Sequence, residues 1–110
     1  MVYMLATMVY NVCMIEIKQT PAYSEWLASL DNTVQARIAK RVLRLAYGLT
    51  GDVKPIGSGA SELRIDFGPG YRVYFGQHGK TLVIVLGGGD KSTQARDIKQ
   101  ALALWNSLED

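Results

Sequence analysis

Three cationic side chains are placed where they could bind a phosphate. Arg64 and Arg72 each alternate with apolar residues in strand-like segments, and Lys91 follows a third such segment. A Gly-Pro-Gly turn joins the first two segments, so both arginines should lie on the non-core face of neighbouring strands. The planar, permanently charged guanidinium suits a phosphate group. The pattern predicts an anion-binding platform, with an ion-pair lattice to Glu62 and Asp66 as the structural alternative.

Two further side chains, Tyr74 and Lys54, are candidates for contact with a ligand. Tyr74 lies two residues after Arg72 and is predicted to share its polar face, where an aromatic ring could stack on an unpaired RNA base. Lys54 precedes the first of these strands and adds a positive charge. His78 is predicted to lie in a hairpin turn, which favours a solvated histidine over a catalytic one.

The glycine-rich segment GGGDKS, residues 87–92, resembles part of a phosphate-binding loop. Asp90 interrupts the Gly-Lys step of the pattern G-x-x-x-x-G-K-S/T, which argues against a nucleoside triphosphatase. Two interpretations remain. Backbone amides at the start of the last helix, together with Lys91, could hold one phosphate of a larger ligand. Alternatively, the glycines permit a turn into a helix cap.

Hydrophobic periodicity predicts the elements that position these groups. Met14–Lys18 is typical of a short strand, and Thr20-Pro21 reads as the cap and first residue of a helix. Asp31-Asn32-Thr33 supplies capping oxygens for a second helix, which we expect to run to Tyr47 and to stop at Gly48. The two helices should form a hairpin over the core.

Beyond residue 52 the apolar period changes to two, which indicates strands. We expect strands at Ser61–Phe67, Tyr71–Phe75 and Thr81–Leu86, with a further short strand near Val53–Ile56 as an option, and a last helix from about Ser92. The glycines at 87–89 are expected to end the third strand. Consecutive hairpins predict an α+β domain of order β-α-α-β-β-β-α, in which an antiparallel sheet carries an N-terminal helical hairpin and a C-terminal helix.

The charge is segregated along the chain of 110 residues, whose formal net charge is only +2. Residues 32–99 hold eleven Lys and Arg against five Asp and Glu, and acidic ends offset this cationic middle. Such a middle attracts polyanions, although a mixed solvated surface is the plainer explanation. Arg37, Lys40, Arg41 and Arg44 gather on one face of the second helix. One Cys and one His exclude a disulfide within the chain and a Cys/His zinc site, and we expect no metal and no cofactor.

The segment Met1–Cys13 contains no charged side chain. It is too short to span a bilayer and lacks the basic start and cleavage site of a secretory signal. We expect Met14 to be the true start, residues 1–13 to be an upstream extension, and residues 14–110 to form one domain. An added edge strand is the alternative for the extension. The expected compartment is the cytoplasm, with no membrane partner.

The string ELRIDFGPGYRVYFGQHGKTLVIVLGGGDKSTQARDI, together with the helical segment before it, resembles the RelE/ParE toxin superfamily. Within it, the chain is most similar to the addiction-module killer proteins, which are HigB-like. The resemblance implies a type II toxin–antitoxin system, in which a cognate antitoxin silences a toxin that cuts mRNA on the ribosome without a metal. It also implies an antitoxin of the helix-turn-helix type, through which the complex would bind operator DNA.

The resemblance also implies roles for individual residues. The arginine of the family's Gly-Tyr-Arg segment falls on Arg72, a preceding basic residue on Arg64, and a later one on Lys91, so these three are the expected catalytic residues. Two features depart from the family. Asp66 stands where a second lysine is common, and residues 94–98 lack the tyrosine that some members carry. The general base therefore remains open between Lys91, Lys54 and His78.

Two other functions remain open. ParE-like relatives share this fold but bind and inhibit DNA gyrase without cutting RNA. A degenerate toxin that only binds its antitoxin is the third possibility. For the nuclease, the expected RNA-binding residues are Lys54, Tyr74, Arg37, Arg41 and Arg44.

Overall fold

The computed structural model describes residues 15–108. Its elements follow the chain order β1 (Glu16–Gln19), α2 (Pro21–Ala28), α3 (Asn32–Leu45), β2 (Val53–Gly57), β3 (Ala60–Ile65), β4 (Tyr71–His78), β5 (Leu82–Asp90), the 3-10 helix η1 (Lys91–Thr93) and α4 (Gln94–Leu108). The expected elements are all present, and β2 is the short strand that the sequence left as an option. The predicted extension, residues 1–13, lies outside the described residues.

One five-stranded sheet has the strand order β1-β5-β4-β3-β2. The four strands from β2 to β5 pair antiparallel as consecutive hairpins, whereas β1 pairs parallel with β5. This arrangement confirms the predicted α+β class with a mostly antiparallel sheet. No helix in residues 15–108 is long and apolar enough to cross a bilayer.

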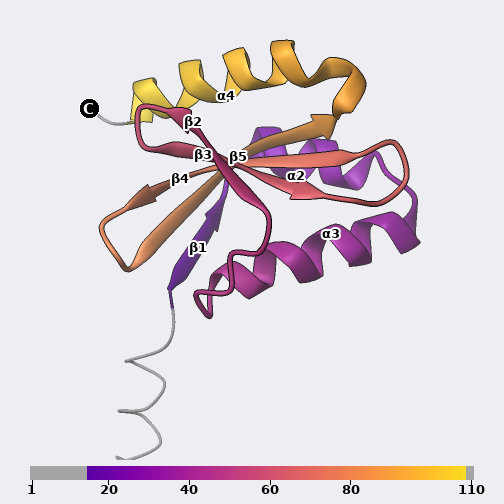
Figure 1. The fold of residues 1–110 in the computed structure, drawn as a ribbon, viewed down its shortest axis with the longest axis horizontal. Helices are drawn as coiled ribbons and strands as arrows, with labels where there is room; N and C mark the ends of the chain where they lie inside the picture. Colours follow the sequence, from indigo (N-terminus) through magenta and orange to yellow (C-terminus); the bar gives the residue numbers. More distant parts are fainter. Residues whose placement is uncertain (1–14, 109–110) are drawn as a thin grey trace, which may run out of the picture.

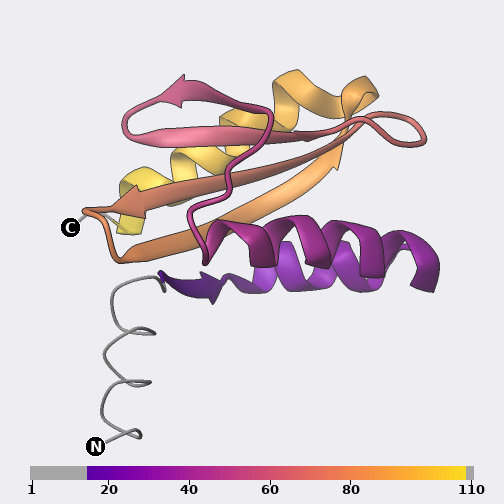
Figure 2. The same ribbon diagram turned by 60° about the horizontal axis from the view of Figure 1, so that its bottom comes forward.

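Both faces of the sheet are covered by helices (Figures 1 and 2). On one face, α2 and α3 pack on a core that includes Tyr23, Ile38, Leu63 and Val73. On the other face, α4 packs on a smaller core that includes Trp105. The strand face that alternation marks as polar is therefore partly buried beneath α4.

The starts of the two hairpin helices are built differently. The Thr20 hydroxyl accepts a hydrogen bond from the Tyr23 amide at 3.3 Å and donates one to the Val85 carbonyl at 2.8 Å. The cap of α2 therefore also fastens the helix to β5. Asp31 occupies the N-cap position of α3, but its side chain makes no capping hydrogen bond. That helix ends at Leu45, two residues before the predicted end.

The prediction that glycines 87–89 end the last strand is wrong, because β5 continues through them to Asp90. Gly88 lies beneath the ring of Trp26, and Gly89 lies beneath the carboxylate of Asp97. A Cβ atom at either position would collide with the side chain above it. The glycines thus let α2 and α4 approach the two faces of an unbroken strand.

Two predicted placements on β4 are also wrong. Tyr74 is fully buried beneath α4, beside Trp105, because α4 covers the strand face that was expected to be exposed. His78 is the last residue of β4, so it does not lie in the hairpin turn. Its ring is 4.7 Å from that of Trp105, centroid to centroid, and β4 continues three residues beyond the predicted end.

The buried Tyr23 predicts a loss of stability in alkali. Burial raises the pKa of its hydroxyl to about 12, and no described group hydrogen-bonds to it. The unfolded chain, whose tyrosine pKa is about 10, loses the proton first, so folding stability should fall between pH 10 and pH 12 by about 2 kcal/mol. Tyr23→Phe should remove this part of the pH slope, measured by urea unfolding. Tyr74→Phe is a parallel variant because the pKa of Tyr74 is also raised by burial. A full alkaline slope in Tyr23→Phe would contradict the assignment.

Candidate functional site

The three predicted catalytic residues come together around one hollow of about 320 Å³. Arg64 on β3 and Arg72 on β4 are directly paired across the two strands. Lys91 reaches the hollow from η1, which follows the neighbouring strand β5. The remaining lining residues are Asp52, Asp66 and Gly70. We call this hollow the cationic site.

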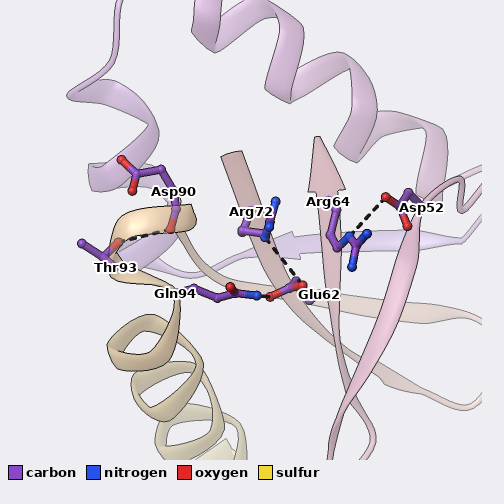
Figure 3. Close-up of polar contacts among 7 residues, drawn as sticks. All are labelled: Asp52, Glu62, Arg64, Arg72, Asp90, Thr93 and Gln94. Carbon is purple, nitrogen blue, oxygen red and sulfur yellow. Dashed lines mark hydrogen bonds and ion pairs between the residues drawn. The ribbon is translucent and has the colours of Figure 1, made fainter. Parts of the chain in front are cut away.

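Arg72 is held by a buried carboxylate. Its side chain is 13% exposed, and its Nε atom lies 3.7 Å from Oε1 of Glu62, which is only 1% exposed. The other carboxylate oxygen of Glu62 accepts a hydrogen bond from the Gln94 amide at 2.7 Å. Figure 3 shows Glu62 between Gln94 at the start of α4 and Arg72 on β4. One carboxylate thus links the helix to the guanidinium.

Arg64 is held more loosely than Arg72. Its Nε atom lies 3.2 Å from Oδ2 of Asp52, and the side chains of this pair are 41% and 59% exposed. Solvent screens such a pair, so its contribution to stability is small. A bound anion could replace Asp52 without exposing a buried charge. The expected ion-pair lattice is thus present in part: Glu62 pairs with Arg72, but Asp52, rather than Asp66, pairs with Arg64.

The glycine-rich segment leads into a capped helix. The carboxylate of Asp90 accepts hydrogen bonds from the Ser92 amide at 2.8 Å and from the Ser92 hydroxyl at 2.5 Å. These bonds hold the pKa of Asp90 below its ordinary value. The Ser92 amide at this helix start therefore already donates to a carboxylate within the chain, which favours the helix-cap interpretation over the phosphate loop. Lys91 remains exposed beside the cationic site.

A second hollow, of about 370 Å³, lies against the basic face of α3. Its lining residues are Arg37, Lys40, Arg41, Arg44, Ile65, Asp66 and Phe67. The predicted clustering of cations on one helix face is therefore present. The guanidinium of Arg37 lies 4.1 Å from the ring centre of Phe67. Asp66 lines both hollows, so the cationic site and the α3 face are contiguous.

Two predicted contact residues, Lys54 and Tyr74, and one candidate base, His78, lie elsewhere. Lys54 is exposed on β2, opposite Glu62, and is outside the residues that line the cationic site. Tyr74 is buried, so it offers no ring for stacking, which corrects the prediction. His78 is at the far end of β4 from Arg72, paired with Leu82. Of the three candidates for a general base, Lys91 is the one that lines the cationic site.

The sequence interpretation missed the buried role of Glu62 and the contribution of Gln94. Alternation placed Glu62 on the same face as Arg64, and the last helix carried an apolar stripe that needed a sheet face to cover. Because the helical hairpin covers the opposite face, α4 had to cover this one. Combining these two signals would have predicted a buried partner for Arg72.

Comparison with solved structures shows which fold this is. The chain superposes on a double-arginine mutant of the toxin RelE from E. coli, in its free state, with a TM-score of 0.66 and 16% identity, covering 83% of this chain and 96% of that one. It also superposes on the RelBE2 toxin–antitoxin complex of Mycobacterium tuberculosis, with a TM-score of 0.61 and 16% identity, covering 73% and 94%. The fold is that of the RelE proteins, as the sequence resemblance predicted.

Sequence comparison identifies the family. Residues 25–105 match the family described as phage-derived proteins similar to Gp49. An uncharacterised protein of Haemophilus influenzae strain Rd is 50% identical over 95 residues, which cover 86% of this chain and 96% of the relative. The chain belongs to the Gp49-like family.

The two ion pairs of the site should differ sharply in their contribution to stability. Glu62→Ala leaves the charge of Arg72 largely buried without a partner, and should lower the free energy of unfolding by about 3 kcal/mol. Asp52→Ala removes the exposed partner of Arg64 and should cost less than about 1 kcal/mol. Urea denaturation of both variants measures the difference. Equal, small losses would show that Glu62 does not hold Arg72.

Proposed function

We propose that this protein is the toxin of a type II toxin–antitoxin module and that it acts as a metal-independent endoribonuclease on mRNA. The observation that carries the proposal is the convergence of Arg64, Arg72 and Lys91 around one open hollow. The RelE fold and the toxins that share it give the proposal its context.

The charges of the cationic site match the needs of RNA cleavage by the RNA's own 2′-hydroxyl. The 2′-oxygen forms a bond to the adjacent phosphorus while the bond from phosphorus to the 5′-oxygen breaks. The products are a cyclic phosphate and a free 5′-hydroxyl. Negative charge accumulates on the phosphoryl oxygens as this happens, and positioned cations stabilise that charge. Arg72, fixed by Glu62, is assigned to these oxygens, and Arg64 is assigned to the same or the adjacent phosphate.

The proton transfers need a base for the 2′-hydroxyl and an acid for the 5′-oxygen. Lys91 is proposed for one of these steps because it lines the hollow and carries an ionisable amine, whereas the His78 ring packs at a tilt against Trp105 at the far end of β4. The reaction consumes one proton and releases one, so a single group could serve in turn as base and acid.

The basic face of α3 is proposed to hold the RNA or ribosomal RNA beyond the scissile phosphate. Arg37, Arg41 and Arg44 line the hollow that adjoins the cationic site at Asp66. A groove lined by four cations and one carboxylate has a net positive charge, which attracts and orients a polyanion. Lys54 is proposed to contribute at longer range, from the edge strand. The proposed protein partner is a cognate antitoxin of the helix-turn-helix type, which would carry the complex to operator DNA.

Induced expression tests the proposal. The native protein should arrest translation and produce new mRNA 5′ ends. Arg72→Ala should lower the cleavage rate at least 100-fold because a preorganised charge is lost from the transition state. Arg72→Gln is the matched variant that keeps a polar amide beside Glu62 but removes the charge, so loss of activity in a folded Arg72→Gln separates a catalytic effect from misfolding. Mapping of 5′ ends measures the rate.

Lys99→Ala is the charge control, since Lys99 is exposed on α4 and outside the residues lining both hollows. It should cleave at the native rate. Full activity in Arg72→Ala would overturn the assignment of that residue. Filamentation with DNA damage and intact transcripts would instead identify a gyrase inhibitor, and the absence of either effect would identify an inactive relic.

A further inference from the structure

Asp66 is an acidic residue that lines both hollows of the site. It lies among three cations in the cationic site and among four cations in the second hollow, beside α3. Asp66 is exposed, and within residues 15–108 its side chain has no hydrogen bond and no ion pair. A negative charge on a path for RNA phosphates weakens their binding, unless the carboxylate makes a contact of its own with the RNA.

The turn after β3 places Asp66 where the two hollows meet. The strand ends at Ile65, and the Phe67 amide donates a hydrogen bond to the Ile65 carbonyl at 2.8 Å. Such a three-residue turn interrupts the alternation of the strand at its central residue, which is Asp66. A strand of RNA that passes from one hollow to the other would therefore pass this carboxylate.

The second hollow also offers a flat group on which a base could stack. The guanidinium of Arg37 lies over the Phe67 ring, 4.1 Å from its centre, and the Phe67 ring packs on Tyr71 at 6.2 Å between centroids. This contact joins α3 to the loop between β3 and β4, and both lie at the same end of the molecule (Figures 1 and 2). Arg37 itself is exposed. Unpaired RNA bases stack on guanidinium planes as well as on aromatic rings.

The chemistry of a carboxylate favours one base over the other three. An ionised carboxylate only accepts hydrogen bonds, so it distinguishes bases by their N–H donors. Guanine has two neighbouring donors on its Watson–Crick edge, N1–H and the N2 amine, which match the two carboxylate oxygens. Adenine and cytosine have an acceptor nitrogen beside their amine, and uracil has a carbonyl on each side of its N3–H. These acceptors would face a carboxylate oxygen and repel it.

A protein partner fits the same place less well. An arginine side chain also presents paired N–H donors to a carboxylate. However, the cations of the two hollows would repel a second positive charge, whereas they attract the phosphates of an RNA strand. The surroundings of Asp66 therefore favour a neutral base carried on a polyanion.

We propose that the second hollow binds an unpaired guanine of the RNA strand whose phosphate occupies the cationic site. The base stacks on Arg37, and its N1–H and N2 amine donate hydrogen bonds to the carboxylate of Asp66. The hollow, of about 370 Å³, is large enough for one base. This inference rests on the proposed ribonuclease function and adds base selection to it.

Binding of uncleavable RNA to the native protein is the first test. Short 2′-O-methyl oligoribonucleotides lack the attacking hydroxyl, and each guanine in turn is replaced by inosine, which lacks only the N2 amine. At one position inosine should weaken binding about tenfold, because one hydrogen bond to a charged group is lost. At that position 7-deazaguanine should bind as guanine does, because its Watson–Crick edge is unchanged. Equal affinities for guanine and inosine at every position would overturn the proposal.

Asp66→Asn keeps the shape of the side chain and removes its charge. In this variant, inosine should weaken binding by about twofold or less, and guanine-free RNA should bind more tightly than to the native protein, because a repulsive charge is gone. The matched charge control is Glu25→Gln, since Glu25 is exposed on α2 and outside the residues that line the two hollows. It should keep the full inosine effect. An undiminished inosine effect in a folded Asp66→Asn, checked by thermal unfolding, would overturn the role of Asp66.

Arg37→Lys tests the stacking contact, because it keeps the charge and removes the planar group. It should bind the guanine-containing RNA about tenfold more weakly than the native protein, because a stacking surface is lost. The slope of log affinity against log salt concentration should stay the same, because the number of cations facing phosphates is unchanged. Native affinity in Arg37→Lys would overturn the stacking contact.

The outcomes for the two proposals are separable. Cleavage of RNA without any dependence on guanine overturns the guanine site and leaves the ribonuclease standing. Guanine-dependent binding that requires Asp66, in a protein that does not cleave RNA, supports the guanine site and removes the ribonuclease. Absence of any RNA binding overturns both.

Discussion

The close approach of two helices to β5 is the constraint on which the site depends. At Gly88 the ring of Trp26 lies against the strand from one side, and at Gly89 the carboxylate of Asp97 lies against it from the other. This second contact sets the height of α4 above the sheet, and with it the position of Gln94 over Glu62. Arg72 is therefore oriented by a chain of contacts that starts at a glycine on the neighbouring strand. A side chain at either position would lift a helix and loosen the carboxylate that holds the guanidinium.

The two arginines of the cationic site are suited to different tasks by their surroundings. Arg72 is desolvated and paired with a buried carboxylate, so it is fixed before any ligand arrives. Arg64 keeps an exposed partner and can exchange it for a phosphate at little cost. In the proposed reaction, the fixed Arg72 is suited to stabilising charge that develops on the phosphate. Arg64, which can exchange its partner, is suited to capturing the polyanion. In the proposed ribonuclease, Lys91, on a short helix with a capped start, is the residue of the site whose side chain can exchange a proton, which neither guanidinium can.

Much of the fold could be predicted from the sequence, because alternation and helical spacing are local signals. The pairing of Arg64 with Arg72 could be predicted from the Gly-Pro-Gly turn between their strands. Lys91 lies at the same site because it follows β5, the strand that pairs with β4. The errors share one cause. Tyr74 and the glycines of 87–89 were interpreted on one strand at a time, but their environment is set by helices that arrive from elsewhere in the chain. Whether a polar strand face is buried depends on which helix packs over the sheet, and the residue pattern of a single strand does not contain that information.

The parallel pairing of β1 with β5 carries a consequence for folding. Glu16 pairs with Leu82, so the first strand of the described residues finds its neighbour only after α2, α3 and the strands β2 to β4 have been made. Such sequence-distant contacts carry a high loop-closure cost and slow the search for the native state. During synthesis, β1 and the helical hairpin after it emerge long before β5, which pairs with β1 and accepts the Thr20 hydrogen bond that fastens α2 to the sheet. The β1–β5 pairing and the cationic site, which needs Lys91, therefore become complete only after β5 and η1 have been made, and a chain that terminates before β5 would lack both.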